Sequence, residues 1–426
     1  MAGFEIDVSR ELYIAAPPGV AVYAQNPAYT SVAGRSLIES VKHEALHFGV
    51  GGDRVYYHRR IFRRRSDDNG VTWTELPDQH RESPDTLNGQ QRHVSGHVLD
   101  ERRDRLISMH GTYEIDASEP MFSRGNQRQR TYRMWYEWSA DGGRTWAAAK
   151  QMIDSRPGFD GAQWAPGVTY GQRGAIADRA NVVFLDDGSF VFGLTASNID
   201  VPADMPQPDS EGYSAVIYAR GRWNAAGDDI DWRFGDRLIV PPNLSVRGGC
   251  EPSVAHLGGE RIFVVMRCQG DEARGLYSTR YCCTSDDGGA SWGALTTLHY
   301  DDGSPVHTPA SYAKFFVSSK TGRTYWLANI LDHPVHGQTP RYPLAIAEFD
   351  TDRCVLVRDS VRIIADRPAD APVERRYSNW GMYEQRDTGD LILTLPEQPR
   401  DYDFSAMTRP EQFTADCYRY RVRLTE

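Results

Sequence analysis

The sequence has little of what membrane, secreted and nucleic-acid-binding proteins require. No stretch approaches the ~18 consecutive apolar residues of a membrane-spanning helix. The N-terminus lacks the basic region followed by an apolar core that marks a signal peptide. The formal net charge of −10 leaves no generally basic surface for the phosphates of a nucleic acid. These absences predict a cytoplasmic protein with neither a membrane nor a nucleic acid as partner.

Cofactor motifs are also missing. The six Cys residues show no metal-ligand spacing, no Gly-rich phosphate loop follows a strand, and no calcium loop is present. We therefore expect no cofactor and no bound metal, and free thiols of the kind found in a reducing compartment. No segment has the apolar period of an amphipathic helix, so only short helical turns are expected.

Aromatic residues and glycine are abundant instead. Ten Trp, 22 Tyr and 38 Gly residues are typical of a protein built from strands and tight turns. The sequence therefore predicts an all-β fold.

One eight-residue pattern occurs three times. Ser-x-Asp-x-Gly-x-Thr/Ser-Trp is found at Ser66–Trp73, Ser139–Trp146 and Ser285–Trp292, and we call these segments the Asp boxes. The Asp carboxylate can accept hydrogen bonds from the amides of a turn while Gly takes a positive φ. Trp can then fill a neighbouring apolar gap. The pattern predicts turns that stabilise the fold rather than catalytic residues.

The spacing of the Asp boxes reveals a repeat. Their first residues are 73 and then 146 residues apart, and 146 is twice 73. One copy has therefore decayed, and the chain of 426 residues holds six units of this period. We expect a single domain over residues 1–426, a six-bladed β-propeller with four-stranded antiparallel blades.

Six candidate hairpins support the six units. Each has an apolar strand, a polar turn with Gly or Asp, and a second apolar strand, and we expect each to be the inner hairpin of a blade. They begin at Ala45, His97, Val182, Val254, Lys314 and Met382. The Asp boxes should lie between the two outer strands. The alternating segments near the two termini should pair and close the ring.

Three Asp boxes on a six-unit β repeat resemble the sialidase superfamily of six-bladed propellers. The hairpin GGCEPSVAHLGGERIFVVMR places Glu251 before its first strand and Arg267 at the end of its second, so both should face one mouth of the propeller. The resemblance implies that Glu251 activates a nucleophilic tyrosine, here Tyr377, and that Arg267 holds a substrate carboxylate. Alternatively, Glu251 and Arg267 form only a salt bridge between paired strands.

The resemblance also implies an acid/base aspartate and further arginines. Asp53 lies where the sialidase aspartate would, and Arg35 is the nearest match to the first substrate-binding arginine. The third arginine is missing from the expected fifth-unit stretch, where His307 and Lys314 are the only basic groups nearby. Neither has the planar fork that arginine offers a carboxylate, which argues against sialic acid as the substrate.

A second set of residues suggests different chemistry. His93 and His110 are separated by nearly the same number of residues as Glu251 and Arg267, so both should face the cavity. Arginines that neutralise a carboxylate, together with His or Tyr that move protons, would suit a lyase acting on uronates. Besides the two histidines, the candidates are Tyr170, Arg173, Arg179 and Arg247.

The leading functional prediction is an exo-acting glycoside hydrolase for an acidic or hydroxyl-rich sugar. A polysaccharide lyase and a non-catalytic glycan-binding propeller remain as alternatives, because one fold can host many functions. The expected partner in each case is a saccharide. Two proline-rich segments, Ile199–Gly212 and Leu331–Pro343, are predicted loops that could bind or cover a ligand.

Overall fold

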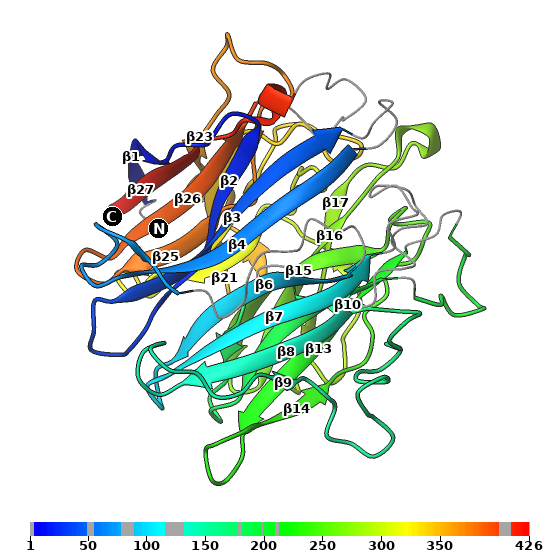
Figure 1. The fold of residues 1–426 in the computed structure, drawn as a ribbon. Helices are drawn as coiled ribbons and strands as arrows, with labels where there is room; N and C mark the ends of the chain where they lie inside the picture. Colours follow the sequence, from blue (N-terminus) through cyan, green and yellow to red (C-terminus); the bar gives the residue numbers. More distant parts are fainter. Residues whose placement is uncertain are drawn as a thin grey trace.

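The computed structural model describes residues 4–48, 55–77, 89–115, 132–177, 181–197, 199–208, 213–399 and 410–425. Six antiparallel sheets form a β-propeller, which confirms the predicted fold (Figure 1). Helical structure in these ranges is limited to short 3₁₀ turns, as expected: η1 (Glu272–Arg274), η2 (Arg358–Ser360) and η4 (Pro410–Phe413).

The blades follow one another along the chain, and their strands have the following bounds. Blade one contains β2 (Val20–Tyr29), β3 (Leu37–Phe48), β4 (Val55–Ser66) and β5 (Thr74–Glu75). Blade two contains β6 (Gly89–Asp100), β7 (Arg105–Ile115), β8 (Tyr132–Ser139) and β9 (Lys150–Gln151). Blade three contains β10 (Ala175–Ile176), β11 (Val183–Phe184), β12 (Phe190–Ser197), β13 (Ser214–Trp223) and β14 (Ile230–Phe234).

Blades four and five also take their strands in chain order, whereas blade six adds the first strand of the chain to the last ones. Blade four contains β15 (Gly249–Gly258), β16 (Arg261–Cys268), β17 (Thr279–Ser285) and β18 (Thr296–Thr297). Blade five contains β19 (Lys314–Val317), β20 (Thr324–Asn329), β21 (Leu344–Asp350), β22 (Val355–Leu356) and β23 (Arg362–Ala365). Blade six contains β24 (Arg376–Tyr377), β25 (Gly381–Gln385), β26 (Asp390–Gln398), β27 (Cys417–Thr425) and β1 (Glu5–Ile14).

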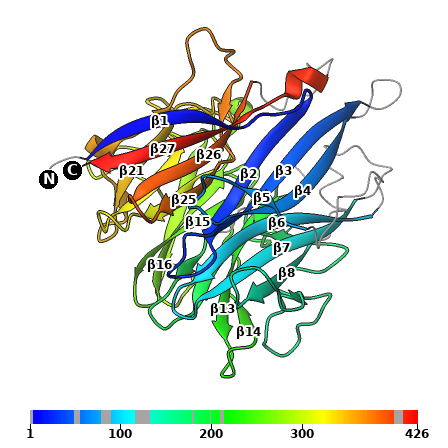
Figure 2. The ribbon, with the colours of Figure 1, turned by 60° about the vertical axis from the view of Figure 1, so that its left-hand side comes forward.

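The ring closes through the two ends of the chain. β1 pairs antiparallel with β27 from Glu5 opposite Thr425 to Ile14 opposite Cys417. In Figures 1 and 2 the blue first strand lies beside the red last strand. The predicted closure is therefore confirmed, and β1 is the outermost strand of blade six.

The predicted inner hairpins are correct for blades two to six and wrong for blade one. The segment from Ala45 covers parts of β3 and β4, the second and third strands, because the inner strand is β2. Pro27 lies inside β2, and a proline usually argues against a strand. β2 accommodates it with a bulge between Gln25 and Ala28, where Asn26 has φ 54°.

Apolar side chains fill the layers between neighbouring blades. Tyr136 of β8 and Trp232 of β14 pack edge to face at 5.2 Å and join blades two and three. Leu327 of β20 and Leu393 of β26 belong to the layer between blades five and six. Burying such a side chain contributes ~1.5–3 kcal/mol, so each blade depends on its neighbours for stability.

The three Asp boxes form the same turn, at the predicted place between the third and fourth strands of blades one, two and four. In the first, the Asp68 carboxylate accepts hydrogen bonds from the main-chain amides of Val71 (3.1 Å) and Thr72 (2.8 Å). Gly70 takes φ 85°, a conformation that strains any other L-residue. Trp73 donates its indole N–H to the Gly70 carbonyl at 3.2 Å.

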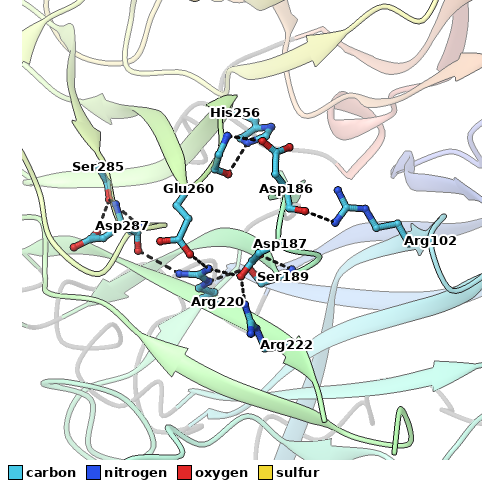
Figure 3. A network of polar contacts seen from close by, with 12 residues as sticks. Arg102, Asp186, Asp187, Ser189, Arg220, Arg222, His256, Glu260, Ser285 and Asp287 are labelled. Carbon is cyan, nitrogen blue, oxygen red and sulfur yellow. Dashed lines mark hydrogen bonds and ion pairs between the residues drawn. The ribbon is translucent and has the colours of Figure 1, made fainter. Parts of the chain in front are cut away.

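A polar network joins blades two, three and four at the Asp-box end (Figure 3). Arg220 of β13 donates to Asp187 (2.8 Å) and Glu260 (2.5 Å), in the first-hairpin turns of blades three and four. Arg220 also contacts a main-chain carbonyl of the third Asp box. Arg102 of blade two donates to a carbonyl in the Asp187 turn at 3.1 Å. These contacts support the structural role predicted for the Asp boxes.

Asp68→Asn tests the contribution of an Asp box to stability. Hydrogen bonds from Thr72, from Ser66 and from neighbouring amides lower the pKa of Asp68 to about 2, below the ~3.9 of an unfolded aspartate. A carboxylate with a depressed folded pKa stabilises the fold above its unfolded pKa and loses this effect as the pH falls from ~4 to ~2. We expect the variant to have a lower Tm than wild type at pH 7, by circular dichroism, and a smaller difference at pH 2.

Asp286→Asn is the matched control. The Asp286 side chain is 82% exposed beside Arg261 in the third Asp box, and we expect its replacement to leave Tm at pH 7 nearly unchanged. An Asp68→Asn difference that is equally large at pH 2 and pH 7 would contradict the carboxylate's role.

Candidate functional site

Glu251 and Arg267 lie at the end of the blade-four hairpin that is opposite its turn. Cys250 is the register partner of Arg267, and a bulge follows between Cys250 and Ser253. In a regular strand Glu251 would point to the other face of the sheet from Cys250. Glu251 has φ 43°, in the left-handed region that glutamate rarely adopts. The bulge redirects its side chain toward Arg267.

Blade three supports this bulge. The main-chain amide of Glu251 donates to the Thr195 hydroxyl of β12 at 2.9 Å. Pro252 packs against Gly193, where an added Cβ would lie 2.3 Å from the proline ring. The close approach therefore requires glycine. Strained residues held in place by their surroundings are typical of functional sites, and Glu251 is such a residue.

Glu251 and Arg267 form an ion pair. Arg267 Nη1 donates to Glu251 Oε2 at 2.7 Å, and the Arg267 side chain is 11% and the Glu251 side chain 18% exposed. The structure thus brings together the two residues that were predicted, from their positions in the hairpin, to face one mouth of the propeller. The contact is also the salt bridge considered as the alternative, so the pair alone does not define a function.

Arg341 is a second arginine at this place, and sequence reasoning missed it. It lies in the predicted loop Leu331–Pro343, between β20 and β21, and is 4% exposed. The Gln338 side-chain oxygen accepts from Arg341 Nη2 at 2.9 Å and from Arg267 Nη2 at 3.1 Å. The sequence search for an arginine in blade five covered the stretch before β19, whereas this arginine follows β20. The signal was its place inside a long proline-rich loop, because loops of that length are often binding elements.

Arg280 adds a third guanidinium behind Arg267. It is the register partner of Arg267 in β17, is 1% exposed, and donates to the Ser311 carbonyl at 2.7 Å. Burial and the charge of Arg267 lower the pKa of Arg280 to about 10, so it remains charged at neutral pH. Glu251 is paired with Arg267, Arg341 shares Gln338 with Arg267, and Arg280 lies opposite Arg267 in the next strand. Such a group of guanidiniums favours an anionic ligand.

Arg247 borders the same centre. It lines a cavity of about 10 Å³ together with Cys250, Arg267 and Gln269. We call Arg247, Glu251, Arg267, Arg280 and Arg341, with Gln338, the arginine centre.

Tyr377 reaches this region with its main chain and not with its hydroxyl. Its amide donates to the Arg341 carbonyl at 2.9 Å. Its side chain is 3% exposed, and the hydroxyl donates to the Asp366 carbonyl at 3.0 Å. Burial, with the nearby charge of Glu397, raises the pKa of Tyr377 above its usual value. The structure therefore does not bring the Tyr377 hydroxyl to Glu251.

Arg35 lies at the opposite end of the propeller. Its carbonyl accepts from the Asn69 amide of the first Asp box at 3.1 Å, and its guanidinium pairs with Asp387 at 3.1 Å. Its side chain is 68% exposed. Because Glu251 lies at the other end of the inner strands, the structure separates Arg35 from Glu251 by the length of a blade.

Several candidate residues of the hydrolase and of the lyase are only partly described. Asp53 and Arg179 lie outside the described residues, and for His93 only the main chain is described, paired with Gly111. His110 is buried on β7 at 5% exposure.

The two candidates from blade three already have partners. The Arg133 guanidinium lies 3.5 Å from the centre of the Tyr170 ring, and Arg173 forms an ion pair with Asp200.

His307 lies in a different cleft. With Tyr300, Tyr342 and Arg358 it lines a space of about 740 Å³ over blade five. It is therefore not a member of the arginine centre.

The described residues contain no group of three His, Cys, Asp or Glu side chains placed to hold a metal ion. No helix among them is both long enough and apolar enough to span a membrane. All six cysteines are free thiols.

Comparison with known proteins concerns the fold alone. No family model and no curated protein matches the chain. A solved structure of a protein of unknown function from Dyadobacter fermentans matches with a TM-score of 0.61 and 12% identity, over 99% of both chains.

Two solved enzyme structures are also similar. An intramolecular trans-sialidase from Ruminococcus gnavus has a TM-score of 0.54 and 10% identity, over 94% of both chains. An α-L-arabinofuranosidase from Fusarium graminearum has a TM-score of 0.51 and 12% identity, over 97% of this chain and 98% of the other. At such low identity a shared fold does not establish a shared activity.

Glu251→Gln tests whether the ion pair is part of a stabilising interior. The change leaves the largely buried Arg267 without its carboxylate, and we expect the free energy of unfolding to fall by about 1–3 kcal/mol. Denaturant unfolding followed by Trp fluorescence measures this change.

The matched control is Glu260→Gln, at the turn of the same hairpin. Glu260 is 46% exposed in its pair with Arg220, and exposed pairs contribute less than ~1 kcal/mol. Equal losses for the two variants would contradict the buried character of the Glu251 pair.

Proposed function

We propose that this chain, which has the six-bladed propeller fold of sialidases, is an exo-acting glycoside hydrolase for a sugar that carries a carboxylate. Two similar structures bear the names of glycosidic-bond enzymes, a trans-sialidase and an arabinofuranosidase. These names support a glycosidase, and the choice of an acidic sugar rests on the arginine centre.

The observation that carries the proposal is the bridge through Gln338. Its oxygen holds Arg267 and Arg341 side by side, at 3.1 and 2.9 Å, so two guanidiniums from different blades converge. A guanidinium fork matches the two oxygens of a carboxylate. Arg280 contributes a further positive charge from behind. A substrate carboxylate would replace part of the Glu251 contact with Arg267.

Glu251 supplies the carboxylate for proton transfer in this proposal. Tyr377 is the proposed nucleophile, and Glu251 would take its proton as the phenol oxygen attacks the anomeric carbon and the glycosidic bond breaks. Burial raises the pKa of Tyr377, so the attack requires such a base. The Tyr377 hydroxyl must also exchange the Asp366 carbonyl for Glu251. Asp53 is the proposed acid that protonates the leaving oxygen.

The lyase is the weaker alternative. Its candidate proton carriers include His110 and Tyr170, and the first is buried while the ring of the second is covered by Arg133. The contact between Arg133 and Tyr170 does not involve a residue of the arginine centre. We therefore place hydrolysis first, and a lyase is one outcome of the experiment below.

Glu251→Gln and Tyr377→Phe test the catalytic roles. We expect wild type to release the chromophore from at least one aryl glycoside in a panel of sialic acid, glucuronic acid, galacturonic acid and arabinofuranose. Loss of the Glu251 base should lower kcat/KM by ~10²–10⁴-fold, and loss of the Tyr377 nucleophile should lower it at least as much.

Glu260→Gln serves as the control and should keep wild-type kcat/KM. Full activity in both Glu251→Gln and Tyr377→Phe would contradict the assigned roles. Ultraviolet-absorbing unsaturated products from acidic polysaccharides, without hydrolysis, would favour the lyase. Saccharide binding without turnover would favour the glycan-binding alternative.

Arg341→Lys tests the recognition of a carboxylate. Lysine keeps the charge but lacks the planar fork, so we expect KM for an acidic glycoside to rise by ~10-fold or more while kcat changes less. Arg362→Lys is the control, because Arg362 lies on β23 and pairs with the exposed Glu5 of β1. This variant should change neither KM nor kcat. An equal effect of Arg341→Lys on an acidic and a neutral glycoside would contradict the assignment.

A further inference from the structure

A cleft over blade five lies apart from the arginine centre. Its volume is about 740 Å³, within the ~300–1,000 Å³ of small-ligand sites. It is lined by residues around the end of β20, the start of β21 and the outer strand β23; β21 and β23 are labelled in Figure 1. The proposed hydrolysis meets this cleft at Asp366, which lines it and whose carbonyl accepts from the Tyr377 hydroxyl.

The loop Leu331–Pro343 forms a wall between the two places. Gln338 and Arg341 point into the arginine centre, while Asp332, His333 and Tyr342 line the cleft. Arg341 and Tyr342 are consecutive residues, so the cleft and the arginine centre are neighbours at the same end of blade five.

The floor and sides of the cleft combine aromatic and apolar groups. Tyr300 and Tyr342 line it, and an arginine lies over each ring, Arg358 at 5.2 Å and Arg367 at 5.1 Å. Ile363 on β23 lines it as well and is 55% exposed. A pyranose or furanose ring presents C–H groups on one face, which pack on such surfaces, and hydroxyl groups at its edge.

The polar groups of the cleft are both donors and acceptors. Asp332 and His333 are paired at 2.5 Å. Burial and the neighbouring His333 lower the pKa of His307, so at neutral pH its ring has one donor and one acceptor nitrogen. Sugar hydroxyls can satisfy both kinds of group at once.

The charges of the cleft are already compensated. Arg358 pairs with Asp302 at 3.5 Å, and Arg367 donates to the carbonyls of Pro368 and Ala371. Both guanidiniums are therefore directed at groups of the protein itself. A neutral ligand with many hydroxyl groups fits better.

We propose that this cleft is a second saccharide-binding site, which takes a neutral sugar unit through His307, Tyr300, Tyr342 and Ile363. The site stands independently of the hydrolysis proposed for Glu251. Its position beside the arginine centre suits a saccharide whose neutral part binds here while an acidic unit lies at Arg267 and Arg341.

Isothermal titration calorimetry tests the site in the Glu251→Gln background, which prevents turnover from confusing the binding signal. The probes are trisaccharides of glucose, galactose, xylose and arabinose, with trigalacturonate as the acidic comparison. We expect at least one neutral trisaccharide to bind. Ile363→Arg, which fills the cleft, and His307→Ala should each weaken this binding at least 10-fold.

Val317→Arg is the matched control, because Val317 is 59% exposed on β19 of the same blade and does not line the cleft. It should bind like the background protein. The proposal fails if no neutral trisaccharide binds, if only trigalacturonate binds, or if Ile363→Arg and His307→Ala, both shown to be folded by circular dichroism, bind normally. Absence of glycosidase activity in the wild-type protein would leave this binding result unaffected, so the two proposals fail separately.

Discussion

The antiparallel pairing of β1 with β27 is the constraint on which the rest of the structure depends. It joins the two ends of the chain in blade six, so blade six can pack against both blade five and blade one. Among the described residues, apolar clusters are shared by blades two and three and by blades five and six, so these blades are buried against their neighbours. Closure therefore determines the angle at which every inner strand meets the others, and with it the distance between loops from different blades.

The arginine centre is a product of that closure. Glu251 and Arg267 come from blade four, Arg341 and Gln338 come from the loop after β20 in blade five, and Thr195 of blade three holds the Glu251 amide. Burying several guanidiniums together is unfavourable unless donors and charges are satisfied. The Gln338 oxygen accepts from Arg267 and Arg341, and the Ser311 carbonyl accepts from Arg280. The convergence of Arg267 and Arg341 is the physical reason for proposing an acidic sugar, because the guanidinium fork matches a carboxylate.

The two ends of the propeller differ in what their charged groups do. At the Asp-box end, Arg220 and Arg102 tie turns of different blades together, and the carboxylates are used within the fold. At the other end, arginines gather around the strained Glu251. The protein as a whole has a net charge of −10, so a local positive centre would attract an anion against the general field.

The sequence by itself determined the repeat, the turns and most of the strands. An Asp box is specified within eight residues, because its hydrogen bonds join residues of the box itself. The Gly70 amide donates to the Ser66 hydroxyl, and the Thr72 amide donates to the Asp68 carboxylate. The hairpin periods identified five inner hairpins, and only the proline inside β2 concealed the sixth. These features depend on local hydrogen bonding and on alternation along a strand, both of which can be read from short stretches.

Only the tertiary structure decided which polar residues meet. The bulge that directs Glu251 toward Arg267 depends on Thr195 and Gly193 in another blade. The approach of Arg341, the direction of the Tyr377 hydroxyl and the distance of Arg35 from the centre follow from how the blades pack around the ring. Such contacts join residues far apart in sequence, and neither spacing nor composition specifies the geometry that brings them together.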